Sequence, residues 1–480
     1  MTGSIISDRE GGGANTREAA PTSSLTPGHF ALPVPPYKLS EFELVMREYL
    51  KRNHLSGSHT PSSFESPPQI MSLEKVLSLP HDQLPDEIWV SIFECLPTYP
   101  SPERRDRCSS TTDEYPIQRM SRTCKRMRAI ALPFMYSDVY LTTDTSVLRT
   151  LLEMWHHPEL VRHVRRFDIY MRALLYPPRS NRTLRAVLRE RRQLEQEFFG
   201  IASVLTKHSP LTTLNFYGAL PKRLADDMLA QCRPAFVRAK NISFERDPLT
   251  STKFDRKSWV DAQNVQNILS HCHAIEQVRL SMVHSGTFTN AHTFPHSLRT
   301  LYMHYVQLSP NTYAVWLSQL PSLKLLHISN PGWAGADFTS LIAAFGHFGP
   351  NLESLAIEES YMAMGIREKT YFTWATVTTE MVKCCSTLTE LRLNGVCYRA
   401  DIVRDLPEPL VSLVMDRMQF GAGRFETISY VEFLDGLIEL PFLKKLIVNH
   451  NYVHEDDLEA EIILRERGVQ SVALKYWYYR

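Results

Sequence analysis

The stretch LRTLYMHYVQLSPNTYAVWLSQLPSLKLLHI at residues 298–328 decides the fold. It opens with the pattern apolar-x-x-apolar-x-apolar in LRTLYM (298–303) and closes with the same pattern in LKLLHI (323–328). Between them, NTYAVWLSQL (311–320) has the apolar spacing of an amphipathic helix. The stretch therefore predicts two strands joined by a helix, which is one unit of a repeat array.

The same strand pattern recurs along the rest of the chain, at intervals of roughly 22 to 38 residues. The further copies are LTTLNF (211–216), IEQVRL (275–280), LESLAI (352–357), LTELRL (388–393), LVSLVM (410–415), LKKLIV (443–448) and VQSVAL (469–474), with FDIYM (167–171) and KNISF (240–244) as degenerate members. Helical patterns such as FTSLIAAF (338–345) and ISYVEFLDGLIEL (428–440) lie between copies. We predict an α/β fold over residues 150–480, an irregular leucine-rich-repeat-like solenoid of parallel strands backed by helices. A doubly wound α/β enzyme domain is the structural alternative.

The strand pattern also predicts which side chains reach a partner. In L-x-x-L-x-L the leucines face the core, and the residues that alternate with them face the open side of the sheet. This register places a row of candidate partner-binding residues on the concave face, namely Arg279, Tyr302, His304, His327, Glu358, Arg392 and Asp416. A slip of one residue would exchange the two faces.

The composition is that of a folded protein without a global electrostatic preference. The 480 residues are 43% hydrophobic and 22% charged, with a net charge of +1, so nothing draws the whole chain to nucleic acid or membrane. The eight cysteines form no C-x-x-C pair, and we expect reduced thiols. The start MTGSIISDREGGG has no signal-peptide pattern, and no apolar run is long enough for a membrane helix. We expect a soluble protein of the cytoplasm or nucleus.

The N-terminal part is predicted to be loosely organised. Residues 1–36 are rich in Gly, Ser, Thr and Pro and are expected to form a disordered tail. Residues 37–55 contain LSEFELVMREYLKRNHL, which predicts an isolated helix that docks on the body or binds a partner. Residues 56–79 are expected to be a linker.

Two helical patterns follow the linker. LPDEIWVSIFECL (84–96) predicts a short helix with proline in its first turn and one broad apolar stripe. IQRMSRTCKRMRAIALPFMY (117–136) predicts a second helix, with its apolar face through Ile117, Met120, Cys124, Met127 and Ala131. A long loop at 97–116 separates them.

These two segments resemble the two halves of an F-box. In the first half Leu84, Pro85, Glu87, Ile88, Ile92, Phe93 and Leu96 stand where the family pattern requires them, and ALPFMYSDVYL is similar to F-box proteins of filamentous fungi. The resemblance covers residues 80–140. It implies a substrate-recognition subunit of a cullin–RING (SCF-type) ubiquitin ligase, with the solenoid selecting a target protein. The residues it implies for adaptor binding are Leu84, Pro85, Ile88, Ile92, Leu96, Met120, Cys124 and Met127. A scaffold outside any ligase and an α/β enzyme are the alternatives.

One local charge feature stands out between residues 162 and 192, where arginine is much more frequent than Asp or Glu. Residues 179–205 have helical apolar spacing, so the arginines are expected on the solvated face of a long helix. A sharper hypothesis is a surface for acidic or phosphorylated segments at Arg182, Arg185, Arg189 and Arg192. Nucleic acid is a weaker interpretation, because no aromatic residues alternate with the arginines.

The sequence contains no motif that predicts catalysis. No G-x-x-x-x-G-K-[ST], G-x-G-x-x-G, G-x-S-x-G or H-E-x-x-H occurs. We therefore expect no enzyme activity, no cofactor and no metal site in this chain.

Overall fold

The computed structural model divides the chain into two units, Met1–Ser78 and Leu79–Arg480. It describes residues 86–95, 117, 121–122, 124–171, 174, 184–247, 260–284, 294–331, 337–359, 368–395, 398–418, 428, 430–450 and 456–476, all of which belong to the second unit. The predicted tail (1–36), isolated helix (37–55) and linker (56–79) lie outside the described residues, as does the loop predicted at 97–116.

Twelve strands in the described ranges form one sheet, in the order β1-β2-β3-β4-β6-β8-β9-β10-β11-β12-β13-β14. All of its neighbouring strands are parallel. The strands are β1 Asp138–Leu141, β2 Arg166–Tyr170, β3 Thr213–Tyr217, β4 Asn241–Glu245, β6 Gln277–Ser281, β8 Thr300–His304, β9 Leu325–Ser329, β10 Ser354–Glu359, β11 Glu390–Gly395, β12 Ser412–Met418, β13 Lys445–His450 and β14 Ser471–Tyr476. Two short strands, β5 Val260–Asp261 and β7 Val283–His284, pair separately.

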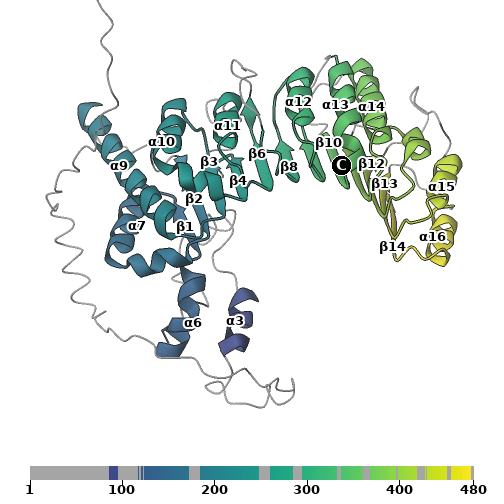
Figure 1. Ribbon diagram of the computed structural model, residues 1–480. Helices are drawn as coiled ribbons and strands as arrows, with labels where there is room; N and C mark the ends of the chain where they lie inside the picture. Colours follow the sequence, from purple (N-terminus) through teal and green to yellow (C-terminus); the bar gives the residue numbers. More distant parts are fainter. Residues whose placement is uncertain are drawn as a thin grey trace, which may run out of the picture. The chain divides into compact units, whose positions relative to one another are not determined.

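Helices connect the strands, as parallel pairing requires. They are α7 Asp144–His156, η2 Pro158–His163, α9 Leu184–His208, α10 Lys222–Arg238, α11 Ala262–Leu269, α12 Pro310–Ser318, α13 Thr339–Phe348, η4 Gly349–Asn351, α14 Glu368–Lys383, η6 Ala400–Asp405, α15 Tyr430–Ile438 and α16 Asp456–Glu466. In Figure 1, α10, α11, α12, α13 and α14 line up along one side of the strands. The opposite side of the sheet carries none of these helices (Figure 1), and we call it the helix-free face.

This architecture confirms the predicted α/β solenoid of parallel strands backed by helices. Each of the eleven quoted strand segments overlaps a strand of the sheet. The sheet also reaches further toward the N-terminus than residue 150, because β1 begins at Asp138. Before the β1 sequence DVYL stands Tyr136, where most other copies have Leu, Ile or Val, which is why the pattern did not reveal this strand.

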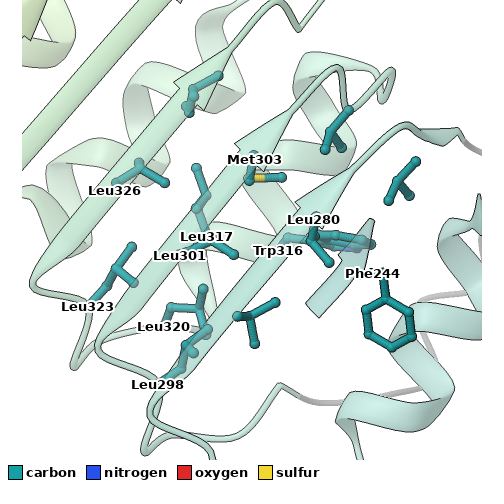
Figure 2. Close-up of a cluster of buried hydrophobic side chains, with 14 of the residues drawn as sticks. Phe244, Leu280, Leu298, Leu301, Met303, Trp316, Leu317, Leu320, Leu323 and Leu326 are labelled. Atoms are coloured by element: carbon teal, nitrogen blue, oxygen red, sulfur yellow. The ribbon is translucent and has the colours of Figure 1, made fainter. Parts of the chain in front are cut away.

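The leucines of the repeat pattern form the core between sheet and helices. Leu301 of β8 pairs in register with Leu326 of β9, and both side chains are buried. Figure 2 shows both leucines in one cluster of buried hydrophobic side chains with Trp316 and Leu317 of α12. Because each strand buries its leucines against its neighbours and their helices, one continuous core runs through the array.

A separate small core lies between α3 (Asp86–Cys95) and α6 (Lys125–Met135). It consists of Trp89, Phe93, Ile117, Met127 and Ala131. We call this pair of helices the hook. The prediction of one continuous helix over 117–136 is wrong, because Cys124 is extended (φ −156°, ψ 167°) and α6 begins after it. The Cys124 sulfur accepts a hydrogen bond from the Met127 backbone N–H (3.4 Å), which caps the new helix start.

Candidate functional site

One row of side chains crosses the helix-free face from strand to strand. Its members stand between the buried apolar positions of their strands, and consecutive members pair in the register of the sheet. The row, which we call the central row, reads Tyr140, Asp168, Asn215, Ser243, Arg279, Tyr302, His327, Ala356, Arg392, Val414, Ile447 and Ala473. Its N-terminal and central parts differ sharply in exposure.

The N-terminal part of the central row is buried and internally satisfied. Asp168 has no exposed surface, and it accepts two hydrogen bonds from the Arg166 guanidinium, Nε to Oδ1 at 2.8 Å and Nη2 to Oδ2 at 2.9 Å. The Asn215 amide donates to Asp168 Oδ1 (2.6 Å), and the Ser243 hydroxyl donates to Asn215 Oδ1 (2.7 Å). Burial raises the pKa of the Glu245 carboxyl nearby, against the opposing effects of Ser243 and Arg279. This network stabilises the fold and offers no surface to a partner.

The exposed part begins at β6 with an arginine stacked on an aromatic ring. The Arg279 guanidinium lies 4.7 Å from the centre of the Tyr302 ring, which is cation–π geometry. With its amide oriented to accept, Gln277 receives hydrogen bonds from Arg279 Nε (2.9 Å) and Nη2 (3.3 Å). The Tyr302 ring in turn meets the His327 ring edge to face at 5.9 Å. Arg279 is therefore both exposed and held in place.

A triad of His327, Glu358 and Arg392 occupies the next strands. The Glu358 carboxylate lies between the other two side chains, with Oε2 3.4 Å from His327 Nε2 and Oε1 2.9 Å from Arg392 Nε. The neighbouring His327 and Arg392 side chains lower the pKa of the Glu358 carboxyl, although burial opposes them. The Arg392 side chain is 55% exposed, whereas that of Glu358 is 19% exposed. The carboxylate thus anchors an arginine whose outer end reaches solvent.

The backbone has an unusual conformation where three strands of the same region end. Met282, Tyr305 and Asn330 follow β6, β8 and β9, and each has a positive φ between 50° and 57°. Their N–H groups donate to the carbonyls of His304 (2.9 Å), Ser329 (2.8 Å) and Glu358 (2.8 Å) on the next strand. Non-glycine residues in this conformation are strained, and such residues cluster where geometry matters for function. The strained residues follow three consecutive strands of the exposed part.

The structure places all seven predicted partner-binding residues on the helix-free face. Arg279, Tyr302, His327 and Arg392 lie in the central row. His304 and Glu358 each lie two residues beyond the row, on β8 and β10. We call these six residues the central patch. Asp416 lies further along, where its carboxylate accepts a hydrogen bond from Asn449 (2.8 Å). Desolvation of its ring lowers the pKa of His304, and repulsion from His327 adds to the decrease. Their role in binding stays a prediction.

The predicted adaptor-binding residues are only partly described. Leu84, Pro85, Leu96 and Met120 lie outside the described residues, and Ile88 and Ile92 lie in α3 with side chains outside the description. Cys124 is exposed at the start of α6, whereas Met127 is buried. Met127 therefore holds the hook together, and Cys124 is the described member that a partner can touch.

The predicted arginine surface lies on α9, which spans Leu184–His208, whereas the sequence predicted a helix over 179–205. Arg189 and Arg192 are exposed, Arg185 lies in the first turn with its side chain outside the description, and Arg182 lies outside the described residues. Their neighbour Arg191 is neutralised by Glu195 (3.2 Å), which also binds Arg223 (3.0 Å). The described part of this surface is thus two exposed guanidinium groups on one helix.

Metal ligands, cavities and thiols were the remaining places for a site in the described ranges. Within them, no group of three or more His, Cys, Asp or Glu side chains is placed to hold a metal ion. A cavity of about 20 Å³ between the sheet and α9 and α10 is lined by apolar side chains, among them Phe167, Phe198 and Met228. Burial raises the pKa of the Cys385 thiol to about 12, which leaves it protonated and unreactive at neutral pH. None of the helices in the described part combines the length and apolar content that a bilayer crossing requires.

Sequence reasoning missed the buried polar network, although a signal existed. Asp168, Asn215 and Ser243 stand at the same position of FDIY, LNFY and ISFE in three consecutive strands. Polar residues at one equivalent position of adjacent strands predict a cross-strand hydrogen-bonded ladder. Aligning the copies by strand register would have found it.

Comparison with known proteins gives distant structural similarity only. No protein-family model matches the sequence, and no curated protein matches it. The crystal structure of a TLR13–ssRNA13 complex is similar over 62% of this chain and 35% of that chain, with 14% identity and a TM-score of 0.36. The leucine-rich repeat domain of the type III effector XopL is similar over 74% of this chain and 93% of that domain, with 14% identity and a TM-score of 0.26. The chain therefore spans about a third of the TLR13 chain, and its leucine-rich-repeat-like fold is assigned from its own topology.

Proposed function

We propose that this chain is a non-catalytic protein-interaction scaffold that holds a partner protein on the central patch. The observation that carries the proposal is the contrast within the central row. Asp168, Asn215 and Ser243 are buried and paired to each other, whereas Arg279, Tyr302 and His327 are at least partly exposed. Arginine and tyrosine are the residue types that dominate the energy of protein interfaces.

The proposal is tested by site-specific photo-crosslinking. p-Benzoylphenylalanine replaces Tyr302 in the central patch or, as a matched aromatic control, Phe442, which is 55% exposed outside the patch. We expect partner crosslinks from position 302 and not from position 442. The purified partner must then bind the wild-type chain and lose binding to the charge reversal Arg392→Glu. Crosslinks of equal yield from both positions, or full binding to Arg392→Glu, contradict a docking role for this face.

As a finer proposal, the scaffold acts as the substrate-recognition subunit of a cullin–RING (SCF-type) ubiquitin ligase. The F-box resemblance of residues 80–140 supports it, together with the independent core of the hook, which leaves the hook free to act as a docking module. In this proposal the hook binds the adaptor subunit, and the central patch holds the target protein. Catalysis belongs to other subunits. The alternatives are a repeat scaffold outside any ligase and an α/β enzyme.

Co-purification with the adaptor subunit tests the finer proposal. The double variant Ile88→Asp, Ile92→Asp is compared with Ser91→Asp, which adds one carboxylate at an exposed position of α3. We expect stoichiometric capture by the wild type and by Ser91→Asp, and loss in the double variant with an unchanged circular dichroism spectrum. If the folded wild-type chain captures no adaptor, the hook resembles an F-box in sequence but does not bind the adaptor. A repeat scaffold outside any ligase is then favoured.

A further inference from the structure

The central patch has a chemistry that indicates one kind of partner. From β6 to β13 the central row reads Arg279, Tyr302, His327, Ala356, Arg392, Val414 and Ile447. This run contains cationic, aromatic and apolar side chains and no carboxylate. A segment that lies along it therefore meets positive charge at two points and apolar surface between and beyond them.

Both arginines are exposed and anchored by a neighbouring side chain. Arg392 uses Nε to bind Glu358 (2.9 Å), and its side chain is 55% exposed. Arg279 is exposed, lies 4.7 Å from the centre of the Tyr302 ring and donates hydrogen bonds to Gln277. A guanidinium held in this way loses little conformational entropy when it binds an anion, and its fork matches the two oxygens of a carboxylate. The acidic neighbour Glu358 is occupied by Arg392 and His327, so it does not repel an incoming carboxylate as a free acid would.

The sheet sets the separation of the two arginines. Arg279 is on β6 and Arg392 is on β11, which are four strand spacings apart in the order β6-β8-β9-β10-β11. At about 4.8 Å for each spacing, the two positions are about 19 Å apart. An extended chain advances about 3.3–3.6 Å for each residue, so about six residues span the distance.

Small and apolar side chains fill the rest of the path. Ala356 lies between His327 and Arg392 in the row, and its side chain is a single methyl group. Beyond Arg392, Val414 and Ile447 pair in register and are partly exposed. Ile447 is two strand spacings from Arg392, about 10 Å, which is about three residues of extended chain.

We infer that the central patch, together with Val414 and Ile447 beyond it, binds an extended acidic peptide segment that crosses the strands. Two carboxylates about six residues apart bind Arg279 and Arg392, and an apolar side chain about three residues further on packs against Val414 and Ile447. This inference rests on the proposed scaffold function and names the chemistry of its partner. A phosphorylated side chain is recognised by the same forks, since it too offers paired anionic oxygens.

The test uses the full chain and synthetic 12-residue peptides in isothermal titration calorimetry. The probe has Asp at positions 2 and 8 and Leu at position 11 in a background of Thr and Ser. The control peptide has the same composition with its two Asp residues adjacent. A third peptide carries phosphoserine in place of Asp, and single-stranded RNA of similar length is the competitor. The variants are Arg279→Gln and Arg392→Gln, with Arg404→Gln as the control because Arg404 is an exposed arginine of η6, paired with Glu432 (3.4 Å).

We expect the probe to bind at least tenfold more tightly than the control peptide, and each patch variant to weaken it about tenfold, which is 1.4 kcal/mol. Arg404→Gln should have no effect, and circular dichroism should show all variants folded. Tighter binding of the phosphoserine peptide would identify phosphate as the preferred source of the anion. The inference is overturned if both arginine variants bind the probe like the wild type, if adjacent Asp residues bind equally well, or if RNA binds more tightly than either acidic peptide. If position 302 crosslinks to a partner but the probe does not bind, the inference of an acidic segment is wrong and the proposed docking face stands. If neither crosslinks nor probe binding are observed, the proposed function is wrong as well.

Discussion

The ion pair between Arg166 and the buried Asp168 leads to a prediction about which partner matters more for stability. Asp168 has no exposed surface, whereas the Arg166 side chain is 39% exposed. We predict that Arg166→Met destabilises the fold more than Asp168→Asn, although arginine is the partner nearer to solvent. The reason is that the loss of Arg166 leaves the buried Asp168 carboxylate without a cationic partner and without access to water.

The magnitudes follow from the hydrogen bonds at Asp168. In Arg166→Met the buried carboxylate keeps the Asn215 amide (2.6 Å) and loses both guanidinium bonds. Breaking a buried ion pair in this way costs about 3–5 kcal/mol. In Asp168→Asn the new amide oxygen still accepts from Asn215 and from Arg166 Nε, so one bond to a charged group is lost, at about 1.5–3 kcal/mol. The exposed guanidinium recovers part of that loss by hydration.

Urea unfolding of both variants, combined with hydrogen exchange, measures the difference. Exchange is needed because a repeat array can open locally, so we expect the largest loss of protection in β2 and β3. The matched control is Arg404→Met, which removes an exposed ion pair and should cost about 0–1 kcal/mol. If Asp168→Asn costs more than Arg166→Met, or if Arg166→Met costs no more than the control, then the carboxylate is not desolvated and the reasoning fails.

Three further predictions concern the repeats and pH. Gly349→Ala should lower the free energy of unfolding in urea by about 1–3 kcal/mol, because the added methyl carbon would lie 2.9 Å from the Cys384 carbonyl oxygen. The control Gly346→Ala, whose methyl carbon would have nothing within 4 Å, should be neutral or stabilising. Equal effects of the two substitutions would contradict the close approach at Gly349. Ser309→Ala should cost about 1 kcal/mol, because the Ser309 hydroxyl caps α12; an unchanged unfolding midpoint would show that the cap contributes nothing. The lowered pKa of His304 means that the folded state disfavours its charged form, so the contribution of this histidine to stability is present above its ordinary pKa of 6.5 and is lost as pH falls through the lowered value. Unfolding midpoints between pH 7.5 and 5 should therefore fall less steeply in His304→Gln than in the wild type, and parallel curves would argue against this effect.

The positions and faces of the strands could be predicted from the sequence. The pattern L-x-x-L-x-L specifies a strand, and its alternation assigns Leu301 to the core and Tyr302 to the opposite face. This works because a strand alternates its side chains with a period of two, so local spacing and tertiary burial agree. Where the local pattern was weak the prediction failed, as at β1 and at the helix that Cys124 interrupts.

The sequence could not distinguish buried from exposed members of the central row. Asp168 and Arg279 occupy equivalent positions in their strands, yet the first is buried with Arg166 and the second stacks on Tyr302 at the surface. Burial on the helix-free face depends on which segments pack there, and these are distant in sequence. The pattern therefore predicted where the candidate site lies, but not which residues of the central row are exposed.

The sequence by itself determined that this protein is a repeat array with a polar row across one face, because strand register depends on apolar spacing that is local in the chain. Only the tertiary structure decided that His327, Glu358 and Arg392 form a triad and that Arg279 rests on Tyr302. These contacts join neighbouring strands separated by the intervening helices and loops, and their geometry depends on the side-chain conformations that packing selects.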